Sequence, residues 1–399
     1  MVGASAPATI VLNHPGALRA LALPLSDLTA GEAYIHDDVD LEGDLVWLLG
    51  FASSLESLPG STLRQVFRLL RKLPRNSRRR DASRPQMRGA LHSPARDRHA
   101  IHHHYDVSNE FYSLFLDPAH VYSCAYFLNT DESLAIAQRR KLDLVCRKLA
   151  LKKGERFLDV GCGWGALVVH AAERYGVSAT GVTLSSEQAW YARRLVEDRG
   201  LDGQVEILEA DYRDLSGQFD AVASIGMFEH VGKAQLGTYF GILAELLVPG
   251  GALLNHGIST RDRVTGRRKP SFVRTYVFPD GELLPIDTVL GAAEEAGFEM
   301  RDTESLRMHY GLTLRHWVTN LGARRAEAAD LVGELNYRIW LLYMAGSATA
   351  FESGAISVYQ MLLTKPDRPW TYGRSELLAR DDGRQPDMVD IRHTSDANR

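Results

Sequence analysis

Apolar and polar positions follow two periods along the middle of the chain. Between residues 156 and 260, short apolar runs typical of buried strands alternate with segments whose apolar residues recur every three to four positions. The apolar runs predict strands at 156–163, 178–185, 205–212, 219–226 and 252–259. Helices are predicted between them at 165–176, 185–200 and 233–247, and Gly200 stands where helices commonly end. Strands separated by helices of this length imply βαβ units, so the predicted fold class is a doubly wound α/β domain with a parallel sheet covered on both faces.

The pattern is different on both sides of this region. Residues 1–73 carry the apolar runs ALRALALPL and LVWLLGFASSLESL around the strand-like EAYIHDDVDLEGD, which predicts a small α+β domain. Residues 74–99 form a basic linker, and the large domain spans 100–399. Within it, LVGELNYRIWLLYMAGSATAF predicts a long helix and AISVYQMLLTK a strand, whereas the tail beyond about residue 380 has no such pattern.

Composition excludes several classes of protein. Cys124, Cys146 and Cys162 are an odd number of cysteines without the spacing of a zinc site, so we expect neither a disulfide framework nor a metal. The N-terminus has no basic region ahead of its apolar residues, and no window approaches the roughly 20 apolar residues needed to span a bilayer. A net charge of −4 argues against a nucleic-acid partner. We therefore expect a cytoplasmic protein.

The basic residues are concentrated in one segment, 71–98, where ten Arg and Lys face only Asp81 and Asp97. Its Pro, Ser and Gly content is typical of an exposed linker. One interpretation is a solvated tether. The other is a polybasic segment attracted to anionic phospholipid head groups, where each Lys or Arg contributes about 1 kcal/mol. The second interpretation predicts peripheral association with an anionic membrane surface.

Three successive strand ends carry groups suited to a nucleotide-like ligand. The first ends in LDVGCGWG, whose glycines allow a ligand close to the backbone and to the start of the following helix. The second ends in GVTLSSEQ, and the third in the acidic-aromatic pair Asp211–Tyr212. In turn these suit a zwitterionic amino acid, a ribose and a purine. This arrangement resembles the S-adenosylmethionine (SAM) site of class I methyltransferases.

Longer segments narrow the resemblance. HYDVSNEFYSLFLDPAHVYSCAYF, DYRDLSGQFDAVASIGMFEHVG, and HGIST followed by YVFPDGELLP resemble cyclopropane-fatty-acyl-phospholipid synthase and its mycolic acid cyclopropane synthase relatives. LTAGEAYIHDDVDLEGD also resembles the small N-terminal domain of the bacterial phospholipid enzymes. The resemblance implies a Rossmann-like class I methyltransferase catalytic domain at 100–399 and a lipid-associated domain at 1–73.

The resemblance also implies a reaction. A methylene group passes from SAM to the cis double bond of an unsaturated acyl chain in a membrane phospholipid, and the resulting carbocation loses a proton to bound bicarbonate as the cyclopropane ring closes. Such an alkene is a poor nucleophile, so the site must hold it close to the sulfonium methyl group and exclude water. The oligomeric state is left open, with a homodimer as one candidate.

Five positions match the family's bicarbonate cage, namely Cys124, Glu229, His256, Ile258 and Tyr310. His256 and Tyr310 can donate hydrogen bonds to an anion, as can the main-chain N–H groups of Cys124 and Ile258, while Glu229 can accept the O–H of bicarbonate. From the residues alone, Glu229 could instead cap the following helix, and His256 could be a satisfied core histidine.

The resemblance implies the cofactor-binding residues as well: Tyr122, Ser123, Asp159, Gly161, Gly163, Gly165, Thr183, Leu184, Gln188, Asp211 and Tyr212. One position departs from the family. Where its members commonly have a cysteine in the late helix, this chain has Ser347. A serine without an adjacent His/Asp pair is a poor replacement for a thiolate, which favours direct methyl transfer over a covalent route.

Three other functions remain open. The same carbocation could give a methyl or methylene branch in place of a ring, although Glu229, His256 and Tyr310 favour the ring. The chain could be a lipid-binding relative without catalysis, against which the intact cofactor turns argue. A small-molecule N- or O-methyltransferase is compatible with the fold, but has no use for the long segment that leads into VYSCAYF.

Overall fold

The computed structural model describes residues 7–24, 26–55, 60–74, 96, 108–261 and 270–367. The chain divides into two compact units, Met1–Arg368 and Pro369–Arg399, and all described residues belong to the first. The tail beyond about residue 380 lies outside the described residues, as does the predicted linker at 74–99 apart from its residues 74 and 96.

The N-terminal part combines a two-stranded antiparallel sheet with short helices. Its elements are β1 (Ala8–Leu12), α1 (Ala17–Ala22), α2 (Asp27–Ile35), β2 (Val39–Gly43), α3 (Leu45–Leu55) and α4 (Gly60–Leu70). The strand-like stretch 32–44 divides into the end of α2 and then β2. Helix α2 forms because the Ser26 side chain accepts a hydrogen bond from Thr29 N and so caps its first turn.

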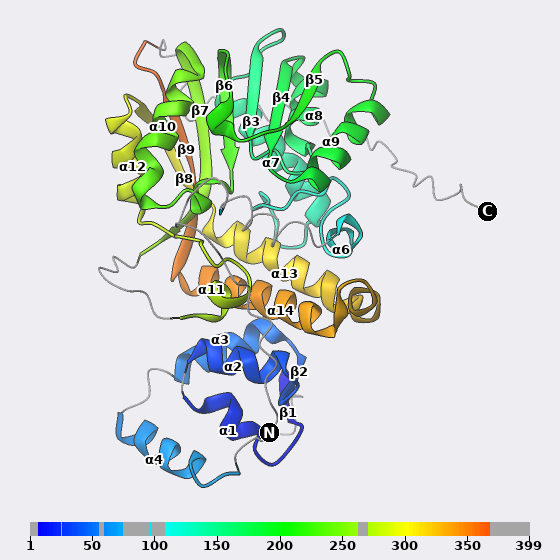
Figure 1. The fold of residues 1–399 in the computed structure, drawn as a ribbon, viewed down its shortest axis with the longest axis vertical. Coiled ribbons are helices and arrows are strands. Elements are labelled where there is room, and N and C mark those ends of the chain that lie inside the picture. Colours follow the sequence, from blue (N-terminus) through cyan, green and yellow to red (C-terminus); the bar gives the residue numbers. More distant parts are fainter. Residues whose placement is uncertain are drawn as a thin grey trace, which may run out of the picture. The chain divides into compact units, whose positions relative to one another are not determined.

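A seven-stranded sheet forms the centre of the large domain, in the order β5-β4-β3-β6-β7-β9-β8 (Figure 1). Its strands are β3 (Arg156–Val160), β4 (Ser178–Thr183), β5 (Val205–Glu209), β6 (Phe219–Ile225), β7 (Leu247–Thr260), β8 (Glu299–Ser305) and β9 (Ile356–Thr364). Strands β3 to β7 pair in parallel, as the alternation of strands and helices predicts.

Helices cover both faces of this sheet, which confirms the doubly wound fold. One face is covered by α7 (Leu134–Leu149), α8 (Ala166–Tyr175) and α9 (Ser186–Asp198), and the other by α10 (Leu236–Glu245) and α12 (Ile286–Glu295). Neighbouring strand residues divide between the two cores. Phe157 packs with the α7–α9 side and Leu158 with the α10–α12 side, as the period of two requires.

Strand β9 departs from the parallel pattern, because it pairs antiparallel with both β7 and β8. The reason lies in α13 (Arg307–Ala323) and α14 (Arg325–Ser353), which connect β8 to β9. Both helices lie along the carboxyl edge of the sheet (Figure 1). The chain returns at that same edge, where Ile356 pairs with Thr260 at the end of β7, so β9 must run in the opposite direction.

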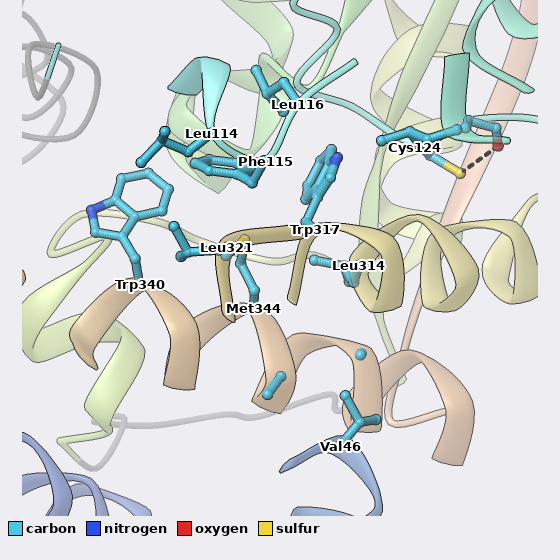
Figure 2. Close-up of a cluster of buried hydrophobic side chains, with 14 of the residues drawn as sticks. Val46, Leu114, Phe115, Leu116, Cys124, Leu314, Trp317, Leu321, Trp340 and Met344 are labelled. Atoms are coloured by element: carbon cyan, nitrogen blue, oxygen red, sulfur yellow. Dashed lines mark hydrogen bonds between the residues drawn. The ribbon is translucent and has the colours of Figure 1, made fainter. Parts of the chain in front are cut away.

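A cluster of buried apolar side chains lies between α13, α14 and the segment that leads to Cys124 (Figure 2). It includes Phe115, whose ring centroid lies 6.1 Å from that of Trp317 and 6.0 Å from that of Trp340. The short helices α6 (Asn109–Ser113) and α11 (Phe272–Tyr276) and the 3₁₀ turns Tyr212–Asp214, Phe228–His230 and Lys233–Gln235 complete the described elements.

The N-terminal elements pack against α14. Arg338 on that helix is only 4% exposed, and its Nη1 donates to Tyr34 O at 3.0 Å. Its Nε donates to Glu334 on the same helix, and its guanidinium lies 4.9 Å from the ring centroid of Tyr34. From α3, Val46 joins the cluster of Figure 2, and its carbonyl accepts from Thr349 Oγ1.

Candidate active site

A pocket opens at the carboxyl ends of β3, β4 and β6, where the strand order reverses between β3 and β6. Ligands bind at this position in doubly wound sheets. Nine of the predicted cofactor-binding residues line it: Tyr122, Ser123, Asp159, Gly161, Gly163, Thr183, Leu184, Gln188 and Tyr212. Gly165 and Asp211 are not part of the lining.

The glycine turn after β3 forms the floor of the pocket. Gly161 and Gly163 have φ angles of 80° and 55°, in the left-handed region that favours glycine. The N–H groups of Gly161 and Cys162 both donate to Val182 O at 2.9 Å, which ties the turn to β4. A Cβ added at Gly163 would meet no protein atom within 4 Å, so the space beside this residue is left to the pocket.

The next two strand ends form the sides. After β4, Thr183 Oγ1 donates to Gln188 Oε1 at 2.8 Å, and Ser185 caps helix α9. After β5, Tyr212 lines the pocket, while the buried Asp211 lies behind it. Asp211 accepts two hydrogen bonds from the Arg213 guanidinium, at 2.8 and 2.6 Å, and so holds this turn in place.

Helix α7 fixes the stretch VYSCAYF against the pocket. Gln138 Nε2 donates to Ser123 O at 2.8 Å, and Lys141 Nζ donates to Ser123 Oγ at 2.9 Å. Lys141 is 1% exposed, and burial lowers its pKa to about 8, while the neighbouring Asp159 partly restores it. Sequence reasoning missed Lys141. The signal was a lysine at a position where the helical period of α7 calls for an apolar residue.

Cys124 has a fully buried thiol. Its Sγ–H donates to Ala125 O at 3.2 Å, the contact drawn in Figure 2. Burial raises the pKa of this thiol far above its usual range, so the group stays protonated. A protonated, enclosed thiol does not serve as a nucleophile. Ala125 N donates to Thr313 Oγ1 at 3.0 Å, which joins the stretch to α13 one turn beyond Tyr310.

Glu229 and His256 each present a buried polar atom that no described residue bonds to. Glu229 Oε1 accepts from Ile258 N at 2.7 Å, so its carboxyl group bonds to β7 and does not cap a helix. Glu229 Oε2 has no hydrogen-bond partner among the described residues, and neither has His256 Nε2. Burial raises the pKa of Glu229 to about 7 and holds the pKa of His256 well below its usual range.

The five predicted cage positions lie in one region of the molecule. His256 and Ile258 stand two residues apart on β7, with Glu229 hydrogen-bonded to the second. Cys124 is part of the buried apolar cluster between α13 and α14, and Ile258 and Tyr310 pack against that cluster. The Ile258 N–H, expected to face an anion, is in the structure the donor to Glu229. Tyr310 packs on Phe351 with ring centroids 4.6 Å apart.

Two further findings concern membrane spans and metal ions. No helix in the described part of the chain combines the length and the apolar character needed to cross a bilayer. Within 7–367, excluding the gaps named above, no group of three or more His, Cys, Asp or Glu side chains is placed to hold a metal ion. Cys124, Cys146 and Cys162 are all free and buried.

Known proteins that are similar to this chain include enzymes named as methyltransferases and as cyclopropane synthases. Residues 92–361 match the family described as mycolic acid cyclopropane synthetase. A probable fatty acid methyltransferase from Pseudomonas putida is 41% identical over 381 residues, which cover 93% of this chain and 92% of the relative. Cyclopropane-fatty-acyl-phospholipid synthase from Escherichia coli strain K12 is 40% identical over 262 residues, covering 66% of each chain.

Among solved structures, the mycolic acid cyclopropane synthase CmaA1 in complex with SAH and CTAB is similar, with a TM-score of 0.64 and 36% identity. The match covers 67% of this chain and 98% of that one. The cyclopropane synthase MmaA2 from Mycobacterium tuberculosis gives the same TM-score at 34% identity. These matches confirm the resemblance found in the sequence. The chain belongs to the mycolic acid cyclopropane synthetase family, whose members are SAM-dependent methyltransferases.

Proposed function

We propose that this enzyme transfers a methylene group from SAM to the cis double bond of unsaturated acyl chains in membrane phospholipids and so forms cyclopropane chains. One observation carries the proposal. Two buried polar atoms, Glu229 Oε2 and His256 Nε2, have no hydrogen-bond partner among the described residues. Their residues adjoin the pocket lining, because His256 pairs with Ile225 and Glu229 precedes His230, and Glu229 bonds to Ile258, which packs on the apolar, aromatic cluster. An unpaired buried polar atom costs roughly 1–3 kcal/mol, which argues that a ligand meets these two.

The donor set suits a small planar anion that carries its own O–H. His256 Nε2 and the Tyr310 hydroxyl would donate to its oxygens, together with the Cys124 N–H. Glu229 Oε2 would accept its O–H. Bicarbonate fits this description, and when bound it supplies a base for the proton that the transferred methyl group loses. Lys141, whose charge acts on both His256 and Asp159, adds a positive field that favours an anion here.

The aromatic residues around the cage would shield the reacting groups from water. Tyr122 stacks on Trp317 with ring centroids 5.1 Å apart, between the cofactor pocket and α13. An acyl chain held against this cluster would bring its double bond to the transferred methyl group while water is kept out. Aromatic faces would also stabilise the positive charge that develops on the alkene carbons.

A second product class is favoured by a separate observation. The Pseudomonas putida relative, which this chain matches over 92% of its length, is named a probable fatty acid methyltransferase. The same carbocation could lose a different proton after a hydride shift and leave a branch in place of a ring. Glu229 and His256 support the ring, because a base fixed beside the methyl group removes the proton that closes it.

The N-terminal part offers a surface for the membrane that holds the substrate. On α3, Trp47 and Phe51 stack with ring centroids 5.5 Å apart, and they are 43% and 50% exposed. On α4, Phe67 and Leu69 are exposed beside Arg68. Apolar side chains next to basic ones suit the interface of an anionic bilayer. We propose peripheral association of residues 1–73 with such a surface.

Two assays test these proposals separately. Purified enzyme, SAM, bicarbonate and vesicles of a phospholipid with cis-octadecenoyl chains should yield chains heavier by one methylene, with one SAH per product. SAM turnover without any change in the acyl chains would contradict the substrate assignment. In flotation, F67S/L69S should bind anionic vesicles more weakly than wild type, and equal binding would contradict the membrane surface.

A further inference from the structure

His256 is the end of a row of polar side chains that crosses three strands. Its partner in the antiparallel register of β7 and β9 is Gln360, and Gln360 is in turn the partner of Glu304 on β8. Lys148 on α7 packs over this row, donating to Glu304 Oε2 at 2.5 Å and to Gln360 Oε1 at 2.8 Å. Lys148, Gln360 and His256 are 6%, 1% and 2% exposed, so the bonds from Lys148 to Gln360 and from Gln360 to His256 are buried.

The chemistry of Lys148 fixes the orientation of the Gln360 amide. An ammonium group only donates hydrogen bonds, so the atom that faces it must be the amide oxygen. The amide NH₂ therefore faces the other way, 3.2 Å from His256 Nδ1. Because an NH₂ group only donates, Nδ1 must accept and cannot carry a proton.

We infer that Lys148 and Gln360 act as positioning residues that hold His256 in the neutral tautomer with its proton on Nε2. Nε2 has no hydrogen-bond partner in the part of the chain that the structure describes, so the tautomer presents an N–H donor to the proposed anion site. The opposite tautomer would present a lone pair to the anion and repel it. This inference rests on the proposed function, which supplies the anion, but the tautomer itself can be measured without it.

Gln360→Glu should reverse the protonation state of His256 Nδ1. The new carboxylate still accepts from Lys148, but it now offers an acceptor to Nδ1, so the imidazole must either move its proton to Nδ1 or become doubly protonated. The charges of Lys141 and Lys148 act on the ring, Lys148 is itself paired with Glu304 and Asp302, and Glu229 bonds to Ile258 on the same strand; the substitution adds one negative charge. Gln360→Met fills similar space and offers Nδ1 no donor, only a weakly accepting thioether sulfur.

The test is ¹⁵N NMR of enzyme labelled at histidine, with the His256 signals assigned by their loss in His256→Gln. Wild type should show an unprotonated Nδ1 and a protonated Nε2 from pH 6 to 8. In Q360E, Nδ1 should become protonated. Gln218→Glu, an exposed amide-to-acid change before β6, should leave the pattern unchanged. Protonation of Nδ1 in wild type, or an unprotonated Nδ1 in Q360E, would overturn the inference.

Kinetics supply a second readout. At pH 8, Q360E should raise the KM for bicarbonate at least tenfold. Its activity should also fall at alkaline pH where that of wild type does not, because only the doubly protonated ring still donates from Nε2. Q360M should raise the KM for bicarbonate less and show no such fall at alkaline pH, and it allows the test if Q360E does not fold. If Q360M and wild type have the same KM for bicarbonate, the positioning role is wrong. If wild type has the expected tautomer but does not respond to bicarbonate, the proposed function fails and the tautomer assignment stands.

Discussion

The buried carboxyl group of Glu229 makes the stability of the protein depend on pH in a way that one substitution should remove. Burial raises its pKa from the ordinary value of 4.5 to about 7. Below pH 4.5 the group is neutral in both the folded and the unfolded chain. Between pH 4.5 and 7 the unfolded chain releases the proton first, so the free energy of unfolding falls as pH rises, and above pH 7 the loss is complete.

The size of this loss follows from the two pKa values. Their difference corresponds to about 3 kcal/mol, at about 1.4 kcal/mol per pH unit. Glu229→Gln is neutral at every pH and can still accept from Ile258 N, so it lacks the loss. From pH 5 to pH 8, the unfolding free energy of E229Q minus that of wild type should therefore increase by on the order of 2 to 3 kcal/mol.

The assay is urea unfolding, followed by tryptophan fluorescence and by circular dichroism, at pH 5, 6, 7 and 8 in buffer free of carbonate. The exposed carboxyl of Glu206 on β5 provides a control, E206Q, which should show no such gain. Adding bicarbonate should raise the urea midpoint of wild type but not of E229Q. If E229Q and wild type differ by the same amount at all four pH values, the argument from burial is wrong.

Three further substitutions test other parts of the molecule. Cys124→Ala should lower turnover less than tenfold, because the thiol is not a nucleophile, whereas E229Q should lower it at least a hundredfold; equal losses would contradict these roles. Gly163→Ala should weaken SAM binding, measured by calorimetry, at least tenfold. The control Gly200→Ala has a similar φ of 63° and equally open space, and should lower only the free energy of unfolding, by the backbone strain of about 1 kcal/mol. Arg338→Met should increase hydrogen exchange in the N-terminal part, since it removes a buried cation that bonds to Tyr34; unchanged exchange there would show that the contact is dispensable.

Local patterns predicted the strands and turns of the large domain well. The run of strands and helices from β3 to β7 follows from periodicity, because each element is defined by residues close in sequence. The glycine turn at Gly161 and Gly163 could be placed for the same reason, and both line the pocket. The helix α13 and the antiparallel direction of β9 were not predicted, since they depend on how the chain returns to the sheet edge.

The polar residues that serve the site from outside it were also missed. Lys141, Lys148 and Gln360 are charged or polar residues in elements whose sequence shows only a helix or a strand. Their roles arise from contacts between residues up to 212 positions apart, as for Lys148 and Gln360. Such a pair has no local signature, and its burial becomes visible only when the sheet and α7 are assembled.

The identity of the product tests the account most directly. Enzyme, bicarbonate and vesicles with cis-octadecenoyl chains are incubated with SAM that carries ¹³C in its methyl group, and the extracted lipids are examined by ¹³C NMR. The account predicts that the label appears as a ring methylene bonded to both former alkene carbons. A label found in a branch methyl or in an exocyclic methylene group would contradict it.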